Sequence, residues 1–209
     1  MKKIAAILIG VSLFGGVLTL YLLSGSGGNG SGDDGGVLSG NALSQYLEEQ
    51  ETNIAYLQIC GNSSDIVYPE LMEATFTPLE SGGWSVEALF LDDAEGPYET
   101  TQYTETFTVS VIDVNTINTA LYDGLNQTYP SEDKMQDLYI QMGFALDIIY
   151  EDGTWISLLT LQSSSGHIVV MSGSGTPDRN LINGDLLEPG NALDGLVAAM
   201  GNVFASHLE

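Results

Sequence analysis

The amino-acid sequence predicts a single α+β domain with a mainly antiparallel sheet, preceded by an N-terminal transmembrane helix. Three features predict this arrangement: an uncharged apolar stretch, a Gly-, Ser- and Asp-rich segment directly after it, and a long remainder in which strand and helix patterns follow no regular order. Regular alternation of strands and helices is typical of a doubly wound parallel sheet. Runs of strands interrupted by helices favour an α+β fold instead.

The apolar stretch at residues 4–23 has the length of a membrane anchor. At 1.5 Å per helical residue it spans about 30 Å, the thickness of the hydrocarbon core of a bilayer. A secretory signal peptide has a shorter apolar segment of about 7 to 15 residues, so an uncleaved anchor is favoured, with cleavage after the stretch as the alternative. Lys2 and Lys3 precede the stretch, and the positive-inside rule then keeps the N-terminus cytoplasmic. We therefore expect residues 1–23 to form a cytoplasmic stub and a single-pass anchor in the cell membrane, with the C-terminal domain extracytoplasmic.

Residues 24–36 consist of Gly, Ser, Asn and Asp. Such a composition cannot bury apolar surface and behaves as a flexible coil. We expect a tether between the anchor and the acidic α+β domain of residues 37–209.

Within residues 37–209 we expect about seven strands and about four helices. Strands are predicted from β-branched, aromatic and alternating apolar residues at 54–61, 74–79, 84–91, 104–114, 144–150, 154–162 and 167–172. Helices are predicted from apolar residues at helical spacing behind capping residues, at 41–51, 115–127, 131–142 and 191–204. Residues 173–190 hold many Gly, Pro, Asn and Asp residues and are expected to form a surface loop.

The chain is strongly acidic, with 28 Asp and Glu residues against 4 Lys and Arg residues and a formal net charge of −24. From residue 37 onward only Lys134 and Arg179 are basic. Such a surface repels nucleic-acid phosphates and anionic lipid headgroups, so we expect no nucleic-acid partner. Adaptation to high salt is the favoured explanation, because molar salt screens charges over about 3 Å. A surface loaded with divalent cations and an ordinary acidic protein are the alternatives.

The sequence contains no recognisable catalytic set. It has no Gly-x-Ser-x-Gly motif, and its two histidines are His167, which follows a serine-rich turn, and His207, which we expect at a frayed terminus. We interpret His167 as structural, and the single cysteine, Cys60, as buried. Two histidines far apart in the sequence and one cysteine do not provide the short ligand spacings of a zinc site, so none is predicted.

Calcium is the one cofactor for which the sequence offers ligands. Asp92, Asp93 and Glu95 lie close together in a predicted turn and could provide carboxylate oxygens. They do not match the twelve-residue calcium-binding loop, because residue 103, the twelfth from Asp92, is a tyrosine. A solvated acidic turn is the alternative, and no other cofactor is expected.

Three Asn-x-Ser/Thr patterns offer glycosylation sites in an exported domain, at Asn29, Asn62 and Asn126. Each lies in a predicted linker, turn or helix end, where a glycan needs to attach.

These features together lead us to expect a membrane-anchored, non-catalytic extracytoplasmic module that binds a protein or a small ligand. An exported, carboxylate-dependent hydrolase similar to a glycosidase is the alternative from the enzyme class. A structural subunit of the cell envelope is the third interpretation.

The anchor makes a direct prediction about location. We expect the full-length chain in the membrane fraction of its native cells after washing at alkaline pH, and a protease added outside intact cells should digest residues 37–209. Recovery of the intact chain from the cytosol would contradict the predicted topology.

Overall fold

The computed structural model of the protein describes residues 38–60, 66–92, 101–134, 142–161, 166–177 and 184–208. The predicted anchor and linker lie outside these ranges. None of the helices in the described ranges combines the length and the apolarity that crossing a membrane requires.

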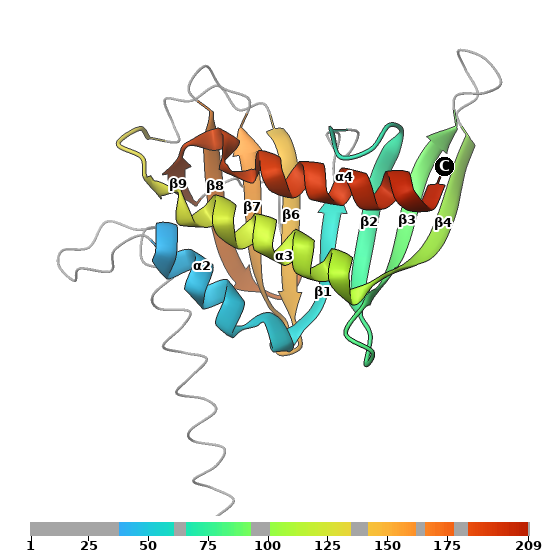
Figure 1. Cartoon of the computed structure of the whole chain (residues 1–209). Helices are drawn as coiled ribbons and strands as arrows, with labels where there is room; N and C mark the ends of the chain where they lie inside the picture. The colour runs from blue at the N-terminus through green and yellow to red at the C-terminus, as the bar shows by residue number, and fades with distance from the viewer. Residues whose placement is uncertain are drawn as a thin grey trace, which may run out of the picture.

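One antiparallel sheet organises the described residues, with nine strands in the order β4-β3-β2-β1-β6-β7-β8-β9-β5 (Figure 1). The strands are β1 (Ile54–Cys60), β2 (Leu71–Pro78), β3 (Trp84–Asp92), β4 (Thr101–Val109), β5 (Tyr129–Pro130), β6 (Met142–Tyr150), β7 (Thr154–Leu161), β8 (His167–Ser174) and β9 (Asp185–Glu188). The predicted α+β class with an antiparallel sheet is thereby confirmed.

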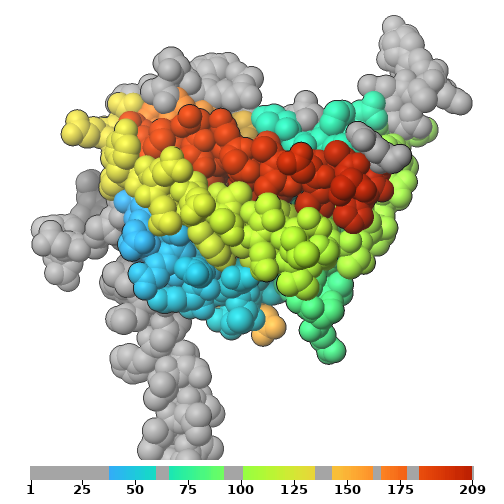
Figure 2. Space-filling view, viewed as in Figure 1, coloured from blue at the N-terminus to red at the C-terminus, as the bar shows by residue number. Residues whose placement is uncertain are grey.

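Three α-helices lie side by side across one face of this sheet (Figures 1 and 2). They are α2 (Gly40–Glu49), α3 (Val111–Asn126) and α4 (Asp194–Leu208), and two short 3-10 helices, η1 (Glu51–Asn53) and η4 (Gly190–Leu193), flank them. Each helix contributes leucine, valine, isoleucine or phenylalanine side chains to the main core beneath it.

The strand predicted at 104–114 is too long, and the reason is a helix cap. β4 ends at Val109, and the Ser110 hydroxyl accepts a hydrogen bond from the backbone N–H of Asp113 at the start of α3. A serine in this position satisfies one of the free N–H groups of the first helical turn. Val111, which continued the alternating pattern of Phe107 and Val109, lies in that turn and is 44% exposed.

The number of elements also differs from the prediction, because two segments were misinterpreted. Residues 129–130 form β5 and residues 131–134 form a bend, so the helix predicted from 131 to 142 does not begin at Ser131. Its predicted last residue, Met142, belongs to β6. The loop predicted at 173–190 contains the end of β8 and all of β9. The described residues therefore have nine strands instead of about seven, and three α-helices instead of about four.

The strand order divides the sheet into two halves of similar topology. Strands β1 to β4 form a meander that leads into α3, and strands β6 to β9 form a second meander that leads through η4 into α4. β1 and β6 pair antiparallel at the centre of the sheet, with Leu57 opposite Ile148 and Ile59 opposite Leu146. The tetrapeptide Gly-Asn-Ala-Leu begins α2 and forms η4, positions that are not equivalent in the two halves.

Each half is covered partly by the helix of the other half. α4 follows the second half, yet its Phe204 lies within 5.5 to 6.4 Å, between ring centroids, of four aromatic rings that all belong to the first half: Tyr68, Phe76, Phe90 and Phe107. α3 follows the first half and ends against η4 of the second. The two halves are thus joined both through the sheet and through the helices above it.

Strands of the second half are buried on both faces. Ile156 and Leu158 of β7 belong to the core beneath the helices, whereas Leu159 and Leu161 belong to a separate apolar cluster on the opposite face. This agrees with the nearly continuous apolar runs of the sequence, which are typical of strands covered on both sides.

The contact between α3 and η4 yields a test of the helix layer. A Cβ added at Gly124 would lie 2.1 Å from the carbonyl oxygen of Ala192, whereas one added at Gly195 in α4 would meet nothing within 4 Å. We expect Gly124→Ala to lower the free energy of unfolding by about 1 to 3 kcal/mol through overpacking. Gly195→Ala should raise it by up to about 1 kcal/mol through helix propensity.

Urea unfolding of both variants, followed by circular dichroism, measures the two effects. An unchanged stability of Gly124→Ala would show that α3 and η4 do not pack in this way.

Candidate metal centre and ligand cavity

Three segments that are distant in the sequence converge at the β5 edge of the sheet. Ile168 of β8 pairs with Leu187 of β9, so the register places His167 opposite Glu188. Tyr129 of β5 pairs with Glu188 from the other side, and the chain then continues to Asp133. Because side chains alternate along a strand, His167 and Glu188 point to the face opposite the helices.

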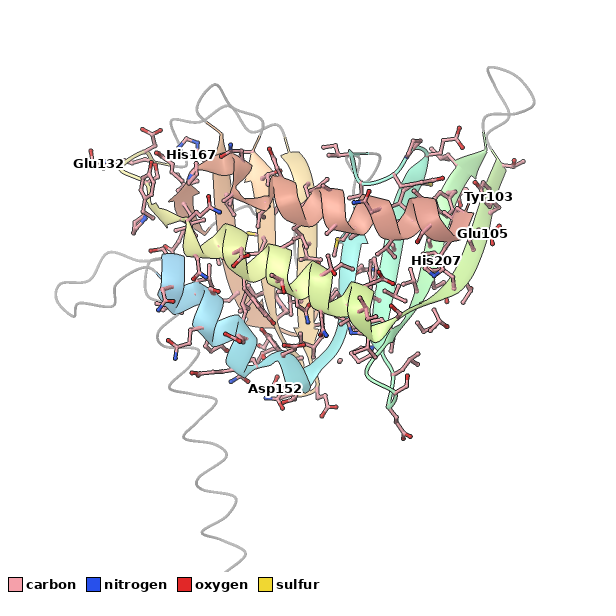
Figure 3. The ribbon with its side chains drawn as sticks, in the orientation of Figure 1. Tyr103, Glu105, Glu132, Asp152, His167 and His207 are labelled. Carbon is pink, nitrogen blue, oxygen red and sulfur yellow. The ribbon has the colours of Figure 1, made fainter. Side chains whose placement is uncertain are left out.

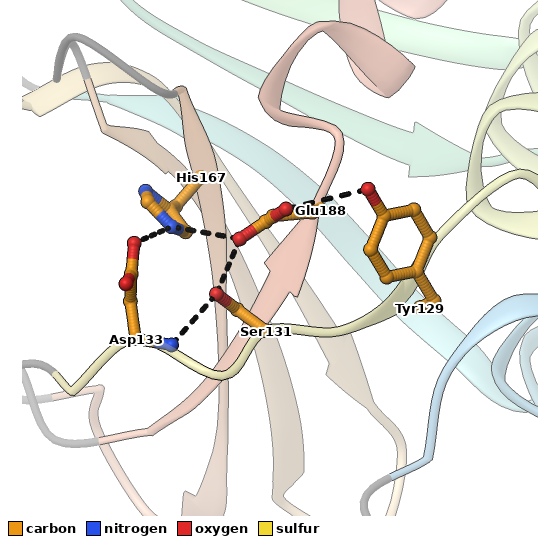
Figure 4. A network of polar contacts seen from close by, with 5 residues as sticks. All are labelled: Tyr129, Ser131, Asp133, His167 and Glu188. Atoms are coloured by element: carbon orange, nitrogen blue, oxygen red, sulfur yellow. Dashed lines mark hydrogen bonds and ion pairs between the residues drawn. The ribbon is translucent and has the colours of Figure 1, made fainter.

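Asp133, His167 and Glu188 form a compact polar cluster (Figure 4). The imidazole Nε2 of His167 lies 3.1 Å from Oδ2 of Asp133 and 3.2 Å from Oε1 of Glu188. The His167 side chain is 0% exposed, that of Glu188 is 27% exposed and that of Asp133 is 52% exposed. The cluster is therefore closed around the imidazole and open to solvent beside Asp133.

Neighbouring hydroxyl groups hold the Glu188 carboxylate in place. The Ser131 hydroxyl donates to Oε1 of Glu188, and the Tyr129 hydroxyl donates to Oε2 at 3.3 Å. The backbone N–H of Asp133 in turn donates to the Ser131 hydroxyl at 3.1 Å. The hydrogen bond from Ser131 is the main cause that lowers the pKa of Glu188, and the Tyr129 hydroxyl and His167 add to it, while partial burial opposes it.

The cluster has ligand atoms for a cation, and its serine, Ser131, lacks the contacts of a catalytic nucleophile. The Ser131 hydroxyl donates to a carboxylate, whereas nucleophilic catalysis needs the hydroxyl to donate to a base such as an imidazole. One imidazole and two carboxylates can instead act as three metal ligands, and their donor atoms all lie within 4.8 Å of one another.

Comparison with protein-family models, with curated proteins and with solved structures found no match for this chain.

A cavity of about 660 Å³, open to solvent, lies between α4 and the ends of β6 and β7. The chain links the two sites directly, because Glu188 belongs to the cluster while Gly190 and Asn191 line the cavity. The other described lining residues are Ile66, Val67, Gly143, Phe144, Thr160, Leu161, Leu193, Asp194, Val197, Ala198, Gly201 and Asn202. Its volume is within the range of pockets that bind small molecules.

The cavity has an apolar interior and a polar rim. Phe144, Leu161 and Leu193 are buried, whereas the α4 residues Asp194 and Asn202 are exposed. The hydroxyl of Thr160, which also lines the cavity, accepts a hydrogen bond from the backbone N–H of Phe144 at 2.7 Å. Asp194 is the only charged side chain among the described lining residues.

A second hollow of about 420 Å³ lies between α2 and α3 and has a different character. Its described lining residues are all polar: Asn41, Ser44, Gln45, Glu48, Thr119, Tyr122, Asp123 and Asn126. The Tyr122 hydroxyl donates to Oε2 of Glu51 at 3.3 Å, and burial, followed by the charge of Glu51, raises the pKa of Tyr122.

Most residues of the predicted calcium site lie outside the described ranges. Asp92 is the last residue of β3, its side chain is not among those described, and Asp93 and Glu95 follow it in the undescribed segment. The calcium site therefore stays a prediction. The same holds for the burial of Cys60, which ends β1.

Of the three predicted glycosylation sites, Asn126 alone lies in a described range. It is the last residue of α3 and is exposed, as attachment of a glycan requires. Asn29 and Asn62 lie outside the described ranges.

The two histidines lie at opposite ends of the molecule (Figure 3). His207 is ordered by its contacts, contrary to the expected fraying, because its ring stacks on Phe107 at 4.7 Å and its Nε2 lies 3.0 Å from the carbonyl oxygen of Thr108. His167 is buried, and its two carboxylate neighbours were not predicted from the sequence. Asp133 was predicted in a helix and Glu188 in a loop. The three residues lie too far apart in the sequence to form a recognisable metal-binding motif.

Proposed function

We propose that this chain is a non-catalytic extracytoplasmic binding module, held in the cell membrane by residues 4–23, that binds a small ligand in the cavity beneath α4. The observation that carries this proposal is the cavity itself, with its apolar interior and its polar rim. The predicted anchor and tether support the location, because together they present the domain outside the cell.

The lining residues favour a neutral or cationic ligand with an apolar body. Phe144 and Leu193 provide apolar contact, and the amides of Asn191 and Asn202 can form hydrogen bonds at the rim. Asp194 adds a negative charge there, and the net charge of −24 repels anions from the whole domain. The same apolar body bearing a carboxylate should therefore bind more weakly.

Binding is favoured over the alternative of glycoside hydrolysis. Hydrolysis by carboxylates needs two acids about 5 to 9.5 Å apart in a cleft, one of them with a raised pKa. In the described residues, the pair of acids that share one hollow, Glu48 and Asp123, are both exposed to solvent. Both carboxylates are therefore in contact with water and are not held in the desolvated setting that the acid of such a pair needs.

A series of naphthalene probes tests the cavity. We expect 1-naphthylmethylamine and 1-naphthalenemethanol to bind the full-length chain in detergent micelles in saturable fashion, and 1-naphthoate to bind at least about 10-fold more weakly because it is anionic. Binding is measured by fluorescence anisotropy, with micelles alone as the blank.

A matched pair of variants in α4 identifies the site. Ala198→Trp should abolish probe binding by filling the cavity, whereas Gly195→Trp, on the same helix but outside the cavity lining, should leave binding unchanged. Equal binding by both variants, or no saturable binding by the parent chain, would refute the proposal.

A further inference from the structure

We propose that Asp133, His167 and Glu188 bind a divalent transition-metal ion, and that zinc is the ion their geometry fits best. This inference is independent of the ligand cavity, because it uses a different set of side chains at the β5 edge of the sheet.

Two of the three distances between the ligand atoms agree with a tetrahedral ion. Zinc–nitrogen and zinc–oxygen bonds are about 2.0 to 2.2 Å long, so neighbouring ligands in a tetrahedron lie about 3.3 Å apart. Nε2 of His167 lies 3.1 Å from the oxygen of Asp133 and 3.2 Å from that of Glu188. The third distance, between the two carboxylate oxygens, is within 4.8 Å, and rotation of the exposed Asp133 side chain can adjust it to the ion.

The ligand atoms, one imidazole nitrogen and two carboxylate oxygens, decide which class of metal the cluster selects. Calcium and magnesium prefer sites made of oxygen atoms, whereas a neutral imidazole is a ligand for zinc and other transition metals. Three protein ligands leave one tetrahedral position for water. The 52% exposure of the Asp133 side chain gives that position access to solvent.

The surrounding residues orient the ligands as metal sites require. Ligating carboxylates are commonly fixed by hydrogen bonds from residues behind them, and loss of such a bond lowers metal affinity about 10- to 100-fold. Ser131 and Tyr129 hold the two oxygens of Glu188 in this way, and the Ser131 hydroxyl is itself held by the backbone N–H of Asp133.

The charge of the domain supports cation binding at this point. Two carboxylates face one imidazole, and the chain carries a net charge of −24, which raises the local concentration of cations. General acidity alone attracts any cation anywhere on the surface, however. Only the imidazole makes this cluster selective, and the experiment has to separate these two effects.

Binding would also connect separate parts of the edge of the sheet. Asp133 follows β5, His167 begins β8 and Glu188 ends β9. Since an ion that binds only the folded chain stabilises it, zinc should raise the midpoint of thermal unfolding.

The test uses the full-length chain in detergent micelles, stripped with a chelator and then titrated with zinc by calorimetry. We expect one strong site per chain, at least about 100-fold tighter than the binding of calcium or magnesium. Asp133→Asn should weaken zinc binding at least about 100-fold, and Ser131→Ala about 10-fold. Because Asp133 is exposed, its substitution should leave the fold intact, which circular dichroism checks.

Glu132→Gln is the matched control, because it removes the same charge from the neighbouring exposed residue (Figure 3). It should leave zinc affinity unchanged within about 2-fold, and it should retain the zinc-dependent rise in the unfolding midpoint that Asp133→Asn loses. Equal losses in Glu132→Gln and Asp133→Asn would show that zinc responds only to general acidity and would overturn the proposal. Absence of a strong site in the parent chain, or equal affinity for calcium, would overturn it as well.

Discussion

The packing of Phe204 is the interaction on which the arrangement of the whole domain depends. This side chain belongs to the last helix, which follows the second half of the sheet, but it is fully buried among aromatic rings of the first half. Truncation of a buried phenylalanine to alanine lowers the free energy of unfolding by about 3 to 5 kcal/mol, and part of this loss comes from the cavity left behind. Because α4 has to cross the sheet to reach this position, neither half can complete its core alone.

The two proposed sites are positioned by that crossing. The chain passes from Glu188, the end of β9, to α4 through residues 189–193, so one short stretch supplies Glu188 to the metal cluster and Asn191 to the cavity. Close packing fixes this segment, since a Cβ at Gly190 would lie 2.2 to 2.5 Å from backbone atoms of Gly166 and His167. The geometry of both sites therefore follows from how α4 is attached to the sheet.

The sequence predicted the fold class and most strands, because alternating and continuous apolar runs directly reflect burial on one or both faces of a sheet. The predictions were wrong where a local pattern competes with a helix cap or with pairing to a distant strand. Val111 continued a strand pattern that the cap at Ser110 interrupts. β9 lies among loop-forming residues, and it is defined in part by its pairing with the distant strand β8. The metal cluster could not be predicted for the same reason, because Asp133 and Glu188 come close to His167 only through strand pairing. The only local signal was a single histidine at the start of an apolar strand in a very acidic chain.

If the two halves of the sheet form one cooperative unit joined by α4, native-state hydrogen exchange of Phe204→Ala should reveal it. The slowest amides of β2 and β3 in the first half and of β7 and β8 in the second should all lose the same protection relative to the parent chain, about 3 to 5 kcal/mol. Loss of protection confined to β2 and β3, with β7 and β8 unchanged, would show that the two halves unfold independently.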